Sequence, residues 1–233
     1  MEKQALQLGE KREFFWDDYI LDTEKTTAQQ RLHSPVYRET VMENDAPWEG
    51  NAISYYNILC INGVYRMYYI AQNRLCYHDT TLPRGREYER GIRICCAEST
   101  DGIHWIKPSL GLRKYHGSTD NNIILDATDD GFDNFYVFFD ERARDYGEHY
   151  KAIASHLVSG GSELWYWSGH DGLRFTRRGK ITDQGAFDSL NIVFFDQENQ
   201  RYVCLYRATM WYGTENSLIA TEMKRLFPCG ISG

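Results

Sequence analysis

The chain has 233 residues, of which 42% are hydrophobic, 25% are charged and 15% are aromatic. This composition is typical of a globular protein and excludes a disordered chain or a coiled coil. Lys and Arg total 26 against 33 Asp and Glu, a formal net charge of −7, so no overall positive field favours nucleic acid or an anionic membrane surface. The expected partner is a neutral small molecule or a carbohydrate.

The first residues contain no apolar core of the length that a secretory signal needs, and no later run approaches the ~18 apolar residues of a membrane-spanning helix. The sequence therefore predicts a soluble, cytoplasmic protein that does not contact a membrane. Its six cysteines form no Cys-x-x-Cys pair and most lie in apolar runs, so we expect reduced, buried thiols.

Short aromatic and β-branched runs, bounded by Gly, Asn and Asp, predict an all-β protein. In chain order the predicted strands are 14–21, 54–61, 65–71, 92–98, 135–139, 150–155, 164–167, 192–195, 202–207 and 217–221. Their spacing favours hairpins and meanders over parallel strands joined by helices.

Two kinds of repeat indicate how these strands are grouped. The segment 133–140 is echoed by 188–196, since Val-Phe-Phe-Asp recurs at 137–140 and 193–196, and each copy precedes a Tyr-led strand. Ser-Thr-Asp-Gly-Ile-His-Trp at 99–105 matches Ser-Gly-His-Asp-Gly-Leu-Arg-Phe at 168–175, an Asp-Gly turn followed by an aromatic residue that starts an outer strand. The unit is a four-stranded antiparallel blade, and the fold class is a β-propeller.

About three blades are present, at approximately 48–115, 130–180 and 186–222, in one propeller-like domain spanning 1–233 with an N-terminal strand at 14–21. Propellers contain about four to eight blades. We therefore expect an incomplete ring, which leaves three alternatives: a fragment of a longer protein, pairing with another chain through unclosed blade faces, or an open sheet or sandwich.

Several motifs resemble those of the five-bladed β-propeller glycoside hydrolases, the group that contains families 32 and 43, and in particular its bacterial sucrose- or fructan-hydrolase-like members. These motifs are Phe-Trp-Asp-Asp-Tyr-Ile-Leu at 15–21, Trp-Glu-Gly-Asn at 48–51, Tyr-Arg-Met-Tyr-Tyr at 65–69, the Ser99 to Gly111 segment, and Asp-Asn-Asn-Ile at 120–123. The resemblance covers 14–221 and implies a carbohydrate-active protein. Asn-Asp-Pro-Asn-Gly and Arg-Asp-Pro, the signatures of family 32, do not occur.

Candidate catalytic residues follow from position, because carboxylates before the inner strands of a propeller converge on one funnel. Glycoside hydrolysis needs two carboxyl groups, one to protonate the leaving oxygen and one to attack or to activate water. The sequence predicts Glu49 as general acid, Asp188 as base or nucleophile and Asp133 as supporting carboxylate. The alternative is that these residues cap turns before strands.

Other polar and aromatic residues are predicted to bind substrate, because amides bond to hydroxyl groups and aromatic faces stack on sugar rings. They are Trp48, Asn51, Asn134, Asn191, Tyr55, Tyr136, Trp211 and Asp18. Packing between blades is the alternative for the aromatic residues. Asp101 and Asp171 are predicted to serve only their Asp-Gly turns.

No zinc site is expected, since the seven histidines lack ligand spacing. The one oxygen-rich segment that favours a metal, Ca²⁺, contains Asp120, Asn121, Asn122, Asp126, Asp129 and Asp130, although a solvated loop is the default interpretation. The main hypothesis is a glycoside hydrolase without a redox cofactor. The alternatives are a non-catalytic propeller module that binds glycan or protein, and an inactive fragment.

Overall fold

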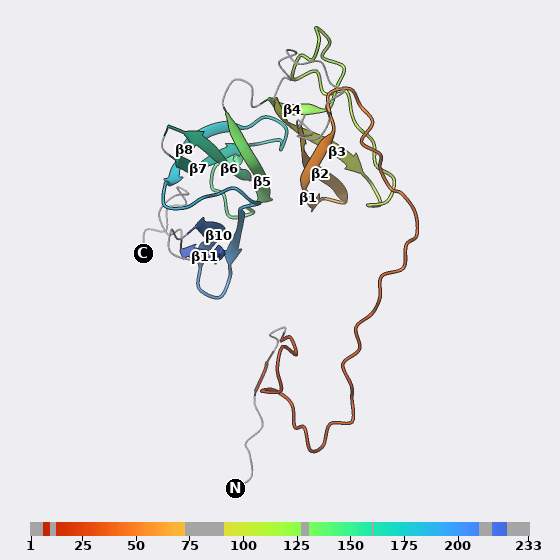
Figure 1. Cartoon of the computed structure of the whole chain (residues 1–233), viewed down its shortest axis with the longest axis vertical. Coiled ribbons are helices and arrows are strands. Elements are labelled where there is room, and N and C mark those ends of the chain that lie inside the picture. The colour runs from red at the N-terminus through yellow and green to blue at the C-terminus, as the bar shows by residue number, and fades with distance from the viewer. Residues whose placement is uncertain are drawn as a thin grey trace, which may run out of the picture. The chain divides into compact units, whose positions relative to one another are not determined.

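The computed structural model describes residues 7–9, 13–72, 91–126, 131–159, 161–209 and 216–222. By contact the chain divides into two compact units, Met1–Glu39 and Thr40–Gly233. All strands of the described residues lie in the second unit, in three separate antiparallel sheets, which confirms the all-β, blade-like fold (Figure 1).

The first sheet has the strand order β1-β2-β3-β4. Its strands are β1 (Ala52–Ile61), β2 (Val64–Gln72), β3 (Ile92–Ser99) and β4 (Ile123–Asp126). Asn62 and Gly63 join β1 to β2 with φ angles of 51° and 79°. Both angles lie in the left-handed region that a two-residue hairpin turn requires and that Asn-Gly adopts readily.

The second sheet has the order β5-β6-β7-β8. Its strands are β5 (Phe132–Phe139), β6 (Tyr150–Val158), β7 (Gly161–Gly169) and β8 (Thr176–Thr182), with a short 3-10 helix η1 (Tyr146–Glu148) before β6. The third sheet joins β9 (Ile192–Asp196), β10 (Arg201–Thr209) and β11 (Asn216–Glu222) in sequence order. The repeats thus correspond to sheets.

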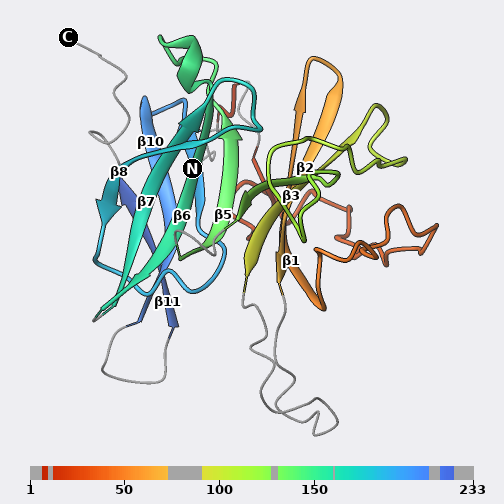
Figure 2. The same ribbon diagram turned by 90° about the horizontal axis from the view of Figure 1, so that it is seen from above.

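The β5–β8 sheet packs against both other sheets. Figure 2 shows β5 beside the strands of the first sheet. Tyr68 and Ile94 of the first sheet pack against Phe135 and Trp167 of the second. Phe138 and Tyr166 of the second sheet lie in one buried cluster with Val193, Tyr202 and Tyr206 of the third. The first strands β1, β5 and β9 contact one another in series, as the inner strands of adjacent blades do.

Residues 14–21, predicted as a strand, instead form bends and turns in the first unit. The Asp17 carboxylate accepts the Tyr19 backbone N–H at 3.0 Å, a local bond that favours a turn over an extended chain. Trp16 is 85% exposed. The aromatic and apolar residues of this run suggested a strand, and the local bond of Asp17 accounts for the turn.

The outer strands differ from the prediction in one of the two blades. In the second sheet Phe175 does precede the outer strand β8. In the first sheet Ile106, just after Trp105, makes only an isolated bridge to Glu98, and the fourth strand is β4, which pairs with Arg93 to Cys95. Four residues are too few for a periodic pattern to be visible in the sequence.

Asp101 and Asp171 serve their turns, as predicted. Asp101 Oδ1 accepts the backbone N–H groups of Ile103 and His104, both at 2.8 Å, and Asp171 Oδ1 makes the same bonds in the second sheet. Cys95, Cys96 and Cys204 are free and buried as expected, while Cys60 is exposed. Within the described ranges, no helix has the length and apolar character to cross a membrane.

Candidate functional site

A hydrogen bond between neighbouring blades joins two of the predicted acidic segments. Asn134 in β5 donates its side-chain N–H to the carbonyl of Phe187 at 2.7 Å. Asp133 directly precedes Asn134 and Asp188 directly follows Phe187. The beginning of β5 and the segment before β9 are therefore held against each other, and each carries a carboxylate.

The backbone has a special conformation at both ends of this bond. Asn134 has φ 57° and Phe187 has φ 52°. Left-handed φ is tolerated by Asn but rare for Phe. Tyr55 of β1 has φ 56°, and the pairing of β1 with β2 shifts register there just as the pairing of β5 with β6 does next to Asn134. Such bulges re-aim the side chains of a strand, and here they recur at the start of two inner strands.

Of Asp133 and Asp188, the acids on the two joined segments, Asp188 is the more accessible. Its side chain is 54% exposed and lies 3.1 Å from the Arg207 guanidinium, which comes from β10 of the same blade. Asp133 is partly buried, and its Oδ1 atom accepts the Asn134 backbone N–H at 2.6 Å. Substrate or water can therefore reach the Asp188 carboxylate, while Asp133 is held in place by the backbone.

Asn134 and Asn191, both predicted to bind substrate, are buried. Their exposed fractions are 1% and 0%, so neither presents its amide to a ligand from solvent. Both direct Nδ2 toward the Phe187 carbonyl, at 2.7 Å from Asn134 and 3.4 Å from Asn191. Their Oδ1 atoms have no hydrogen-bond partner among the described residues. Both amides therefore hold the Phe187 carbonyl, which directly precedes Asp188.

Glu49, the predicted general acid, lies in a separate network within the first sheet and its loops. Its side chain is fully buried and its carboxylate accepts three hydrogen bonds: from Tyr69 Oη at 2.6 Å, from the Ala46 backbone N–H at 2.8 Å and from Lys107 Nζ at 2.8 Å. Burial, with a smaller contribution from Glu49, holds the pKa of Tyr69 far above its usual value. These contacts support a structural role for Glu49 and do not support its predicted catalytic role.

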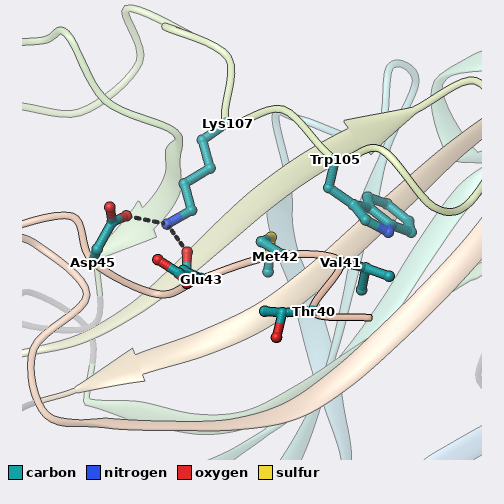
Figure 3. A pocket seen from close by; sticks show the side chains of 7 residues that line it. All are labelled: Thr40, Val41, Met42, Glu43, Asp45, Trp105 and Lys107. Carbon is teal, nitrogen blue, oxygen red and sulfur yellow. Dashed lines mark hydrogen bonds and ion pairs between the residues drawn. The ribbon is translucent and has the colours of Figure 1, made fainter. Parts of the chain in front are cut away.

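A surface pocket of about 460 Å³ lies beside this network (Figure 3). Its walls are the segment Thr40 to Glu43, Asp45, Trp105 and Lys107. Lys107 Nζ donates to the Glu43 carbonyl at 2.6 Å and to Asp45 at 3.2 Å, so its charge is already neutralised by protein groups. The hydrogen bond from Lys107 lowers the pKa of Asp45. None of the predicted site residues lines this pocket.

The predicted stacking residues mostly pack inside the protein. Trp48 donates its indole N–H to Asn122 Oδ1 at 2.6 Å and meets Tyr115 edge-on at 6.3 Å. Tyr55 packs against the core between the first two sheets, and Tyr136 against the core between the second and third, where burial raises its pKa. These contacts fit packing within and between blades, the alternative to stacking on a sugar ring.

Of the remaining predicted substrate-binding residues, Asn51 and Asp18 are exposed, and Trp211 is not described. Asn51 is exposed, and its backbone N–H donates to the Gln72 carbonyl at 3.2 Å. Asp18 belongs to the first compact unit and is exposed. Trp211 lies outside the described residues.

The segment considered for Ca²⁺ uses its oxygen atoms within the protein. Asn122 Oδ1 accepts from Trp48, Asn121 Oδ1 accepts the Ile123 backbone N–H at 3.0 Å, and Asp126 lies 3.5 Å from Arg93. Asp120 is exposed, and Asp129 and Asp130 lie outside the described residues. Across the part of the chain that the structure describes, no group of three or more His, Cys, Asp or Glu side chains is placed to hold a metal ion.

Sequence reasoning missed two ion pairs of the second and third sheets. The pairing of Arg207 with Asp188 could not be predicted from the sequence, because it depends on how β10 folds back beside the loop before β9. Asp140, which ends the first Val-Phe-Phe-Asp repeat, forms a buried ion pair with Lys151 and accepts a hydrogen bond from Tyr202 of the third sheet. The signal for Asp140 was present in the sequence, since a repeated carboxylate at the end of an apolar strand requires a partner if it is buried.

Comparison with known proteins bears on the fold. No family model and no curated protein matches the sequence. Among solved structures, a Bombyx mori glycoside hydrolase family 32 β-fructofuranosidase aligns with a TM-score of 0.52 at 10% identity, over 81% of this chain and 38% of that one. A thermostable family-43 glycoside hydrolase aligns at 0.46 with 14% identity, over 78% and 54% of the two chains.

A sucrose-6-phosphate hydrolase from Lactobacillus gasseri aligns at 0.41 with 14% identity, over 64% of this chain and 26% of that one. The chain thus spans well under half the length of the β-fructofuranosidase. Of these three structures, the β-fructofuranosidase is the one with a TM-score above 0.5. At such low identity the likeness concerns the fold and leaves the chemistry open. By its fold, the described part of this chain is similar to the propeller glycoside hydrolases that its sequence resembles.

Proposed function

We propose that this chain acts on carbohydrates and hydrolyses glycosidic bonds, with Asp188 as base or nucleophile and Asp133 as the supporting carboxylate. One observation carries the proposal: the hydrogen bond from Asn134 to the Phe187 carbonyl holds two acid-bearing segments of neighbouring blades together. Glycoside hydrolysis uses two carboxyl groups within about 5–10 Å of each other, and this bond brings the two segments that carry them into contact.

In the reaction, the bond between the anomeric carbon and the leaving oxygen breaks. A proton passes to the leaving oxygen, and the hydroxyl group of water ends on the anomeric carbon, directly or after a covalent intermediate. Asp188 suits attack or activation of water because its side chain is 54% exposed. Asp133 adds negative charge beside the cation-like transition state. Because the Glu49 carboxylate is buried and already accepts bonds from Tyr69, Ala46 and Lys107, we take the proton for the leaving oxygen from solvent water, which regains one when Asp188 releases the proton of the attacking water.

The first substrates to test are β-fructofuranosides, since the solved structure with the TM-score of 0.52 is a β-fructofuranosidase. Activated aryl furanosides and pyranosides complete the panel, because they need less help from a general acid. The test variant is Asp188→Asn, which keeps the size of the side chain and removes its charge. The expected result is a fall in kcat/KM by several orders of magnitude with little change in the unfolding temperature.

A matched control exists on the same blade. Asp196, at the other end of β9, pairs with Arg201 at 3.4 Å as Asp188 pairs with Arg207. Asp196→Asn therefore removes a comparable ion pair and should leave hydrolysis unchanged. Equal rates for Asp188→Asn and the parent protein on every substrate that the parent cleaves would refute the catalytic assignment.

A second candidate function is a non-catalytic module that binds glycan. The observation favouring it is the complete burial and triple hydrogen bonding of Glu49, because a buried carboxylate held by three protein donors is poorly placed to meet a substrate from solvent. Isothermal titration with fructo-oligosaccharides separates the two candidates. Binding without cleavage by the parent protein would favour the module, and cleavage would exclude it.

A further inference from the structure

We propose that Asn134 is a positioning residue that sets the separation between the Asp133 and Asp188 carboxylates. This inference rests on the proposed function of the two acids, and it gives Asn134 a role other than the substrate binding predicted from the sequence. Asn134 is 1% exposed, so it acts through its neighbours and does not touch a substrate.

The contacts of Asn134 reach both acids. Its backbone N–H donates to Asp133 Oδ1 at 2.6 Å, and its side-chain N–H donates to the carbonyl directly before Asp188 at 2.7 Å. The same Nδ2 atom lies 3.3 Å from Ser155 Oγ, which in turn donates to the Asp133 carbonyl at 3.2 Å. One residue therefore ties the acid of β5 to the backbone that carries the acid of the next blade.

The other end of the connection is equally restrained. The Phe187 side chain is fully buried and its ring lies 5.1 Å from that of Tyr206. The backbone N–H groups of Ala186 and Phe187 both donate to the Arg207 carbonyl, at 3.0 and 3.2 Å. A left-handed Phe persists only where its surroundings determine it, and the bond from Asn134 is part of those surroundings.

Asparagine meets both demands of this position. It adopts a left-handed φ more readily than other residues with a side chain, apart from Asp, and its amide can donate a hydrogen bond to a carbonyl. Gly would adopt the φ but lose the donor, and Asp would place an oxygen against the Phe187 carbonyl. Both variants can keep the left-handed backbone and both lose the hydrogen bond to the Phe187 carbonyl, so they test the bond without changing the backbone conformation.

The separation of two carboxyl groups decides how a glycosidase can use them, and misplacement by about 1 Å can cost on the order of a hundredfold in rate. For Asn134→Gly we expect hydrogen exchange at the Ala186 and Phe187 amides to accelerate about tenfold or more. In crystal structures, the distance between the Asp133 and Asp188 Cγ atoms should differ from that of the parent protein. Asn134→Asp should have the same effects.

If the parent protein cleaves glycosides, we expect kcat to fall about a hundredfold with KM nearly unchanged, because Asn134 is not in contact with substrate. The limbs of the pH–rate profile should also move, since the distance between two carboxylates sets their mutual effect on protonation. A residue that only supported folding would change neither the ratio of kcat to KM nor the pH–rate profile.

The control is Asn121→Asp. Asn121 is also buried, at 3% exposure, and donates to the Arg113 carbonyl at 2.8 Å in a loop of the first blade. This variant should lose stability without altering exchange at Ala186 and Phe187. Unchanged exchange and unchanged Cγ separation in Asn134→Gly would overturn the proposal. These two measurements need no activity, so a parent protein that cleaves nothing refutes the proposed function while the role of Asn134 is still decided.

Discussion

Lys151 of β6 and Asp140, which follows β5, form an ion pair that is closed to solvent, with side-chain exposures of 0% and 1%. Tyr202 of the third sheet donates its hydroxyl to the same Asp140 carboxylate, and the Lys151 ammonium lies 5.3 Å from the centre of the Tyr202 ring. The pair therefore joins the second sheet to the third. A similar contact joins the first sheet to the second, where Arg66 lies 5.9 Å from the ring centre of Tyr150.

Removal of one member of this buried pair should be costly. Lys151→Met leaves Asp140 without its cation, and such losses destabilise proteins by about 3–5 kcal/mol. Lys180→Met is the surface control, because Lys180 is 42% exposed and pairs with Glu163 and Asp183; it should cost much less, since solvent screens exposed ion pairs. Urea unfolding measures both values, and similar costs for the two variants would contradict the assigned importance of burial.

Acid should remove part of the stability that Asp140 provides. Burial acts to raise the pKa of Asp140, but the hydrogen bonds from Lys151 and Tyr202 outweigh it and hold the pKa below its usual 3.8. A carboxyl group with a lowered pKa in the folded state stabilises that state above its unfolded pKa, and this contribution is lost as the pH falls through the folded pKa. We expect the unfolding free energy of the parent protein to fall below about pH 4.

The comparison for this prediction is Asp140→Asn, which cannot titrate. Its unfolding free energy should be lower at neutral pH and should depend less on pH in the acid range. Urea unfolding at a series of pH values provides the measurement. Equal slopes for Asp140→Asn and the parent protein would show that Asp140 contributes nothing to the acid sensitivity.

Gly172→Ala should loosen the contact between the first two sheets. A Cβ atom at Gly172 would lie 2.6 Å from Arg66 Nη1, 2.7 Å from Tyr150 Cε1 and 2.7 Å from Tyr68 Oη, all closer than real contacts allow. Gly63→Ala is the control, because Gly63 has a similar φ, +79° against +71°, and open space around it. We expect Gly172→Ala to cost about 1–3 kcal/mol more than Gly63→Ala in thermal or urea unfolding.

The outward face of the third sheet should promote self-association. Phe194 of β9 is 44% exposed and pairs directly with Val203 of β10. Val203 is half-buried, and an exposed aromatic ring beside it favours contact with a second copy. We expect the parent protein to form oligomers at high concentration in light scattering, and Phe194→Glu to reduce their proportion. Leu157→Glu, at an exposed site of 77% on the second sheet, is the control and should have a smaller effect.

Much of the fold could be read from the order of residues. The Val-Phe-Phe-Asp repeat and the two Asp-Gly turns predicted blades, because strands that repeat a packing task also repeat its local chemistry. Nine of the ten predicted strands coincide with strands of the structure. The short β4 and the charged β8 carried little periodic signal, since an exposed edge strand does not need to alternate apolar and polar residues.

The candidate site depended on contacts between distant segments. By residue type and position, Glu49, Asp133 and Asp188 were equivalent acids before inner strands. Only the tertiary structure gave Glu49 its Lys107 and Tyr69 partners and left Asp188 half exposed beside Arg207. Nine of the strands, the Asp-Gly turns and the acidic positions followed from local sequence, because they depend on local propensity and repeat. Which acid-bearing segments are in contact depended on the packing of two blades, because the Asn134–Phe187 bond joins residues 53 positions apart.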